Sequence, residues 1–172
     1  KALQSSPCLP MARRWLALAQ LRSGQPDKAL ATLEPVVNEG TTDPNLLTLA
    51  GEAQLQMGNF AKSEEYFGKA SKLDPKDPRR RTSLALAQMA GGKVEAGFDQ
   101  LEDIAASDAG TTADLALISA HLRRRELDKA LAAIDALEKK TPGKPTAANL
   151  RGRTLLAKND PVGERKAYEA AL

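Results

Sequence analysis

The sequence predicts an all-α fold, a right-handed superhelical solenoid built from helix-turn-helix repeats. Three observations lead to this prediction. The sequence is self-similar with a period of 34 residues, its apolar residues are mostly Ala and Leu, and small residues recur where two paired helices would cross. A period within about 20–50 residues is the signature of arrays of stacked supersecondary units.

The composition agrees with a helical array. The chain has 172 residues, of which 42% are apolar and only 3% are aromatic. This length suits one domain or one continuous array. Ala and Leu are strong helix formers, whereas the β-branched Val and Ile that favour strands are scarce. No apolar run approaches the ~20 residues that a membrane-spanning helix needs.

The repeat is visible at fixed positions of the sequence. Turn glycines lie 34 residues apart, at Gly24, Gly58 and Gly92, and large apolar residues keep the same spacing, at Leu33, Phe67 and Leu101. The repeat ends fall at Pro7, Thr41, Pro75, Ala109 and Pro142, with the last interval shortened to 33. One residue has therefore been lost, and we place the loss in the turn near Arg125.

Taken in order, the repeats divide the chain into six parts. These are the end of a preceding repeat's second helix (1–9), four complete repeats (10–43, 44–77, 78–111 and 112–144) and a truncated fifth repeat (145–172). We therefore expect a piece of a longer array. Apolar residues left uncovered at its ends, Ala2, Leu3, Tyr168, Ala171 and Leu172, would then fray or pair end to end.

Close packing explains why the pattern has this form. Two antiparallel helices approach closely only where a small side chain lies at their crossing, and we assign that place to Ala17, Gly51, Ala85, Ser119 and Gly152. A large residue of the second helix fills the space beside it, at Leu33, Phe67, Leu101, Ile134 and Tyr168.

Candidate catalytic and metal-binding residues are few. His121 is the only histidine and Cys8 the only cysteine, so the sequence offers neither a metal cluster nor an intramolecular disulfide. Gly91 and Gly92 lie at a repeat turn rather than in a phosphate-binding loop. We interpret His121 as a structural helical residue and Cys8 as a free thiol. The sequence predicts no enzyme, no cofactor, no metal and no small-molecule substrate.

Charge is divided between the two helices of each repeat. Second helices carry most of the acids, whereas the predicted first helices carry Arg13, Arg14, Arg22, Arg79, Arg80, Arg81, Arg123, Arg124, Arg125, Arg151 and Arg153. Side chains opposite the packing stripe of the first helices form the candidate partner-binding groove. This set comprises Arg14, Trp15, Leu18, Asn45, Leu49, Glu52, Arg79, Thr82, Leu86, Leu117, Arg124, Leu150 and Arg153.

One column of this groove has two interpretations. It contains Trp15, Leu49, Ser83, Leu117 and Leu150, which is unusually apolar for a face exposed to water. The column is either buried between neighbouring first helices or open to apolar side chains of a partner. The arginines are likewise either a solubilising face or a basic surface for an acidic segment.

The 34-residue period and the second repeat together resemble the tetratricopeptide repeat family. Leu47, Ala50, Gly51, Ser63, Phe67, Ala70 and Pro75 stand at the places of the family pattern, while Gln54 replaces its usual Tyr. The resemblance implies that the first helices line the concave surface. Family clamps for a C-terminal carboxylate use Lys or Arg with Asn. Arg14 and Asn45 fit this set, but Leu18 and Leu49 stand where Asn is needed.

Stretches 115–124, 127–140 and 149–157 resemble a narrower group, the tetratricopeptide lipoproteins of bacterial exopolysaccharide and PEP-CTERM loci. This resemblance implies a periplasm-facing protein of the cell envelope, attached to the membrane through an anchor outside this sequence, and a role in assembling or exporting envelope components. The cytoplasm is the alternative location.

Two classes of function follow. The first is a non-catalytic scaffold that holds a protein or peptide segment, expected to be acidic and partly apolar. The alternative is a regulatory or adaptor region of a larger protein whose catalytic domain lies elsewhere. Nucleic acid is a weaker candidate partner, because Trp15 is the only aromatic residue of the groove available for base stacking.

Overall fold

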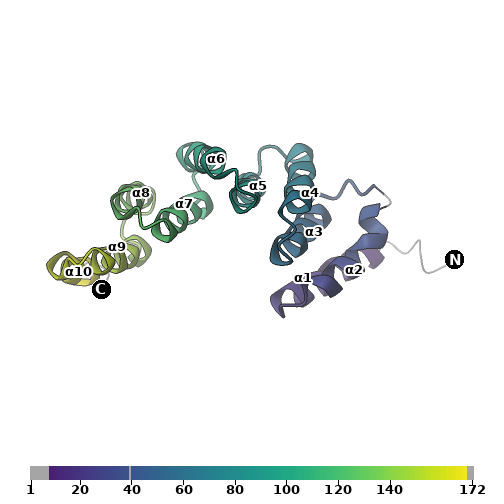
Figure 1. Cartoon of the computed structure of the whole chain (residues 1–172), viewed down its shortest axis with the longest axis horizontal. Helices are drawn as coiled ribbons and strands as arrows, with labels where there is room; N and C mark the ends of the chain where they lie inside the picture. The colour runs from purple at the N-terminus through teal and green to yellow at the C-terminus, as the bar shows by residue number, and fades with distance from the viewer. Residues whose placement is uncertain (1–7, 39, 170–172) are drawn as a thin grey trace. The chain divides into compact units, whose positions relative to one another are not determined.

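The computed structural model describes residues 8–38 and 40–169, and it confirms the all-α fold class (Figure 1). Ten helices and no strand lie within these residues. The helices are α1 (Cys8–Arg22), α2 (Pro26–Asn38), α3 (Pro44–Gln56), α4 (Phe60–Leu73), α5 (Pro78–Ala90), α6 (Val94–Ser107), α7 (Thr112–Arg123), α8 (Leu127–Lys140), α9 (Pro145–Ala157) and α10 (Pro161–Glu169). None of them has both the length and the apolar character required to cross a bilayer. The end residues expected to be uncovered, Ala2, Leu3, Ala171 and Leu172, lie outside the described ranges.

The chain forms two compact units, 1–97 and 98–172, with the boundary inside α6. In the first unit α1 packs on α2 and α3 on α4, while α2 also contacts α3 and α4 contacts α5. In the second unit α7 packs on α8 and α9 on α10, and α8 contacts α9. Each unit is thus a run of helix pairs in which every pair covers the next.

The start of each first helix in the middle of the array is fixed by its sequence. Asp43 precedes α3, and its carboxylate accepts a hydrogen bond of 2.8 Å from the backbone N–H of Asn45. Asp77 precedes α5 and accepts from the N–H of Arg79 at 2.9 Å. A proline follows each cap, where its fixed φ suits the first helical turn and its missing N–H is not needed.

The helices of a pair meet at the small residues that the pattern predicts in the second and fifth repeats. A Cβ added to Gly51 would lie 2.9 Å from the ring of Phe67, and one added to Gly152 would lie 2.7 Å from the ring of Tyr168. The buried hydroxyl of Ser63 donates to the carbonyl of Gly51 at 2.9 Å. The backbone at Gly51 is therefore in direct contact with the second helix of its own repeat.

Two assignments in the fourth repeat are wrong. Ser119 is exposed, whereas Ile118 is only 1% exposed and belongs to the core with Ile134 and Leu137. Ile118 therefore occupies the crossing position. The residue lost from the period does not lie in the turn, because the left-handed turn residue Arg125 already follows Gly92 by 33. The loss lies in the loop between α6 and α7.

Candidate functional site

The packing stripe of the first helices ends in a polar residue rather than the usual Tyr. These residues are Gln20, Gln54, Gln88 and His121, and each bonds to a side chain outside its own helix, namely Thr32 (2.9 Å), Asn59 (2.9 Å), Glu64 (3.2 Å) and Glu126 (2.7 Å). The departure noticed at Gln54 is thus a feature of four repeats. A polar contact connects each of these helices to a turn or a second helix.

His121 has a structural role in this arrangement. Its ring is 4% exposed, stacks on Phe98 with centroids 4.7 Å apart, and forms a 2.7 Å hydrogen bond through Nδ1 with Glu126. The guanidinium of Arg124 lies 5.1 Å from the centre of the Phe98 ring and its Nε is 2.9 Å from Glu126. Within the described ranges, no three His, Cys, Asp or Glu side chains come close enough to hold a metal ion.

The predicted groove residues fall into the two units. In the first unit Trp15, Glu52 and Arg79 are exposed, and Arg14, Leu18, Asn45 and Leu86 are half-buried. In the second unit Arg124 and Arg153 are exposed and Leu150 is half-buried.

Three predicted groove residues are buried and have to be reassigned. Leu49 is 7% exposed and belongs to the core of the first unit. Thr82 is 3% exposed and donates to the carbonyl of Pro78 at 2.7 Å. Leu117 is 8% exposed, because the shifted phase of the fourth repeat moves it out of the column and puts Ala116 there. The first interpretation of the column therefore applies to Leu49.

Trp15 differs from these residues because it is not covered. It is 60% exposed, and the guanidinium of Arg14 lies 5.9 Å from its ring centre. Met11, one turn earlier on α1, is 62% exposed. This end of the first unit presents an uncovered indole next to a cation.

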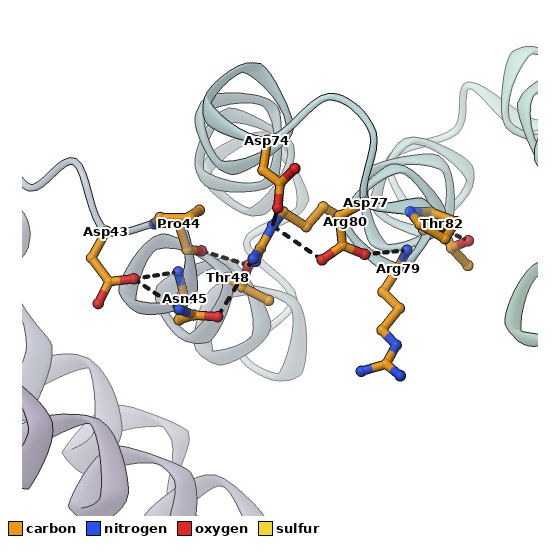
Figure 2. A network of polar contacts seen from close by, with 10 residues as sticks. Asp43, Pro44, Asn45, Thr48, Asp74, Asp77, Arg79, Arg80 and Thr82 are labelled. Carbon is orange, nitrogen blue, oxygen red and sulfur yellow. Dashed lines mark hydrogen bonds and ion pairs between the residues drawn. The ribbon is translucent and has the colours of Figure 1, made fainter.

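Several arginines of the first helices form hydrogen bonds and ion pairs within the fold. Figure 2 shows the guanidinium of Arg80, on α5, surrounded by polar groups of α3 and of the loop between α4 and α5. Its Nε is 3.3 Å from carboxylate oxygens of both Asp74 and Asp77, and it also donates to the hydroxyl of Thr48 at 3.3 Å and the side-chain oxygen of Asn45 at 3.5 Å. The Arg80 side chain is only 12% exposed, so it is not groove charge.

Asn45, a predicted groove residue, is part of this Arg80 cluster. The amide of Asn45 donates to Asp43 at 3.0 Å and accepts from Arg80, so both ends of the amide are engaged within the fold. A carboxylate clamp would need that amide to be available. Arg79, by contrast, extends its side chain away from the cluster in Figure 2, and only its backbone N–H takes part.

Two more arginines are engaged in the same way. Arg13 donates to the carbonyl of Thr32 at 3.0 Å. Arg151 bridges Asp135, at 2.6 Å, and Glu138 on α8. Some of the arginines on the first helices therefore serve to connect neighbouring helices. The exposed remainder includes Arg79 and Arg153.

A cavity of about 200 Å³ opens on the first helices of the first unit. It is lined by Thr48, Glu52, Leu55, Phe67, Ser83 and Leu86. Although Glu52 is exposed, the neighbouring walls partly desolvate its carboxylate and raise its pKa above the ordinary value of 4.5, and the charge of Arg22 opposes this only in part. The sequence placed Glu52 and Leu86 in the groove but had no signal for the hollow between α3 and α5.

A second cavity of about 260 Å³ lies in the second unit, among α6, α7 and α8. Glu102, Leu117, His121, Lys129, Ala132 and Ala133 line it. Two of these residues, His121 and Leu117, are themselves buried. The cavity is thus bounded by two second helices, α6 and α8, and by the first helix α7.

Comparisons with known proteins support the helical-repeat fold described above. The sequence model of the tetratricopeptide repeat family matches residues 48–113 and 115–172. No curated protein matches the chain by sequence.

Solved structures of low sequence identity share the fold. MamA 41-end from Desulfovibrio magneticus RS-1 is 20% identical, with 96% of this chain and 94% of that chain covered and a TM-score of 0.66. YrrB, described as a TPR protein with an unusual peptide-binding site, is 16% identical over 92% of this chain and 82% of its own, with a TM-score of 0.57. The Cut9–Hcn1 structure matches 90% of this chain at 16% identity and a TM-score of 0.67, but only 30% of that chain is covered.

Proposed function

Because the chain belongs to the tetratricopeptide repeat family, we propose that it is a non-catalytic scaffold whose first helices hold a segment of another protein. Stacked helical repeats expose an extended surface suited to this purpose. The fold and the family support binding of proteins or peptides in general, and the surface of the first unit supports a more specific proposal about the segment.

The observation that carries this proposal is the uncovered Trp15 beside Arg14. Trp15 is 60% exposed, and burying its apolar surface against a partner would be favourable. Trp is also one of the residue types most often found at the energetic centre of an interface. Arg79 is exposed too, and it forms no ion pair with any residue that the structure describes. Guanidinium groups offer a planar fork that matches a carboxylate. The favoured ligand is therefore an acidic segment with apolar side chains.

The second unit offers a smaller surface of the same kind. Arg153 is exposed on α9, Leu150 lies one turn before it, and Leu156 is 55% exposed at the end of that helix. We assign this surface the same class of ligand, as a second site to be tested separately from the first.

We propose the bacterial cell envelope as the setting, with a role in assembling or exporting envelope components. The support is the resemblance of 115–124, 127–140 and 149–157 to the lipoproteins of exopolysaccharide and PEP-CTERM loci. Fractionation of the native cells tests this directly, because recovery of the protein with the cytoplasm would contradict it. A catalytic domain encoded in the same gene would favour the adaptor alternative.

Selection from a random peptide library, followed by surface plasmon resonance, tests the binding function. The parent chain should enrich peptides that combine Asp or Glu with apolar residues. Exchanging Arg14 and Arg79 for Ala together should slow association and flatten its salt dependence, because exposed charges act mainly on encounter. Trp15→Ala should instead speed dissociation by roughly tenfold or more, the effect expected of a buried anchor.

Lys28→Ala is the matched control, since it removes an exposed cation from α2, a second helix of the same unit. It should leave both rates unchanged. If the Arg14, Arg79 and Trp15 variants bind the selected peptides like the parent at low and high salt, the first helices are not the binding surface.

A further inference from the structure

We propose that the cavity between α3 and α5 accepts a lysine or arginine side chain of the bound segment, with Glu52 as the ion-pair partner of its charged end. This inference rests on the proposed binding function and deepens it, since it adds one required cation to a ligand that is otherwise acidic.

The lining of the cavity has the chemistry that a long cationic side chain requires. Leu55, Phe67 and Leu86 supply apolar walls for an aliphatic stem, and Glu52 stands among them as the only charged group of the lining. Lys and Arg bury their stems on apolar surface while their heads find a polar partner. The cavity has a volume of about 200 Å³.

The polar groups of the lining are acceptors for an incoming cation. Among the described residues, the carboxylate of Glu52 accepts no hydrogen bond and forms no ion pair. The hydroxyl of Ser83 likewise has no hydrogen-bond partner there, so it is available as a second acceptor. Thr48 differs, because its hydroxyl already donates to the carbonyl of Pro44 at 2.7 Å.

Partial desolvation makes the ionised form of Glu52 less favourable, and a cationic ligand would offset this cost. The surrounding walls disfavour the carboxylate and raise its pKa, and Arg22 acts on it through space without contact. An apolar ligand would bury this carboxylate still further, and an acidic side chain would be repelled by it. A cation compensates the desolvation, which is why the cavity selects against the other two classes.

A side-chain analogue tests the cavity without any partner protein. The probe is n-butylguanidinium, titrated into the full chain while the methyl resonances of Leu55 and Leu86 are followed by NMR. We expect saturable shifts, and binding about tenfold weaker in Glu52→Gln, because a charge-assisted hydrogen bond is lost while the walls are unchanged. Glu34→Gln, an exposed acid on α2, is the control and should bind like the parent.

Equal binding of the probe by the parent and Glu52→Gln, or no saturable shift with the parent, would overturn the inference. Peptide selection separates this result from the binding function. The parent should enrich Lys or Arg at one fixed position, and Glu52→Gln should lose that preference while keeping the acidic one. Acidic selection without a basic position defeats the cation pocket alone, whereas no selection by the parent defeats both proposals.

Discussion

At the scale of single residues, Gly51 lies at a helix crossing that leaves no room for a larger side chain. The ring of Phe67 lies where its Cβ would be, at 2.9 Å. Gly51→Leu should therefore lower the free energy of unfolding by roughly 1–3 kcal/mol through overpacking. Urea unfolding followed by circular dichroism measures this.

Gly68→Leu is a control with the same added bulk. Gly68 is also helical, on α4, but nothing lies within 4 Å of the position its Cβ would take. Its variant should keep or raise the urea midpoint, since glycine is a poor helix former. Equal losses at Gly51 and Gly68 would mean that the crossing does not limit the packing.

Glu126 gives the second unit a dependence on pH whose sign follows from its contacts. The hydrogen bond with His121 lowers the pKa of Glu126 below 4.5, against some desolvation and with help from the charges of Arg124 and Lys129. A carboxyl whose pKa is lower in the folded chain stabilises it above the ordinary value, and this contribution is lost as the pH falls through the folded-state value.

Glu126→Gln should thus lower the urea midpoint at neutral pH and flatten its decline between about pH 5 and pH 3. Glu164→Gln on α10 is the matched control, since it removes an acid elsewhere in the same unit. A variant at Glu126 that declines in parallel with the parent would exclude Glu126 as the source.

At the scale of elements, the Arg80 cluster joins two first helices at their N-terminal ends. By the repeat spacing, Arg80 corresponds to Leu46, Ala113 and Ala147, which are apolar and nearly inaccessible. Removing Arg80 leaves Asp74 and Asp77 close together without their shared cation. Arg80→Ala should cost roughly 1.5–3 kcal/mol of unfolding free energy.

The neighbouring Arg79→Ala should change the urea midpoint very little, because that side chain points away from the cluster (Figure 2). The two variants remove the same residue type from adjacent positions of α5. A loss at Arg79 as large as that at Arg80 would show that general charge, rather than the Arg80 cluster, stabilises the joint.

Elements were predictable from the sequence wherever the period was intact. Gly24, Gly58 and Gly92 fix the turns because each adopts positive φ, and Asp43 and Asp77 mark helix starts. The fourth repeat failed because Arg125 takes the left-handed conformation in place of a glycine, so the turn signal was missing. The resulting one-residue error in helix phase predicted Ser119 in the core and missed Ile118, which is the residue buried there.

The candidate site was predictable only in part, for a physical reason. Helix phase indicates which face a side chain occupies, and it placed Trp15, Glu52 and Arg79 correctly on the exposed side of their helices. Whether an exposed-side arginine is free depends on partners distant in sequence, such as Asn45, which is 35 residues from Arg80. A single sequence carries no signal for that pairing.

At the scale of the whole molecule, a destabilising substitution in one unit should lower the stability of that unit more than that of the other. In a repeat array each unit interacts mainly with its neighbours, so stability is nearly a sum of local terms. Ile134→Ala removes a fully buried side chain of the second unit and should cost about 2–5 kcal/mol there. Amide hydrogen exchange should accelerate in α7–α9 more than in α1–α3.

Leu33→Ala is the reciprocal variant, since Leu33 is equally inaccessible in the first unit. It should reverse the pattern of exchange. Uniform acceleration in both variants would instead mean that the chain opens as one cooperative block.

The Arg80 cluster also bears on how the chain avoids stacking out of order. Repeats of similar shape can slip by one period or exchange between copies, since any apolar face fits another. Arg80 works against such mistakes, because only the repeat containing Asn45 and Thr48 supplies the acceptors that its guanidinium uses across the joint. On any other neighbour the guanidinium would keep Asp74 and Asp77, which are close to it in sequence, but would lose the hydrogen bonds to Thr48 and Asn45. Arg80→Leu should then refold at high concentration with more exchanged dimer than the parent, which size-exclusion chromatography would detect.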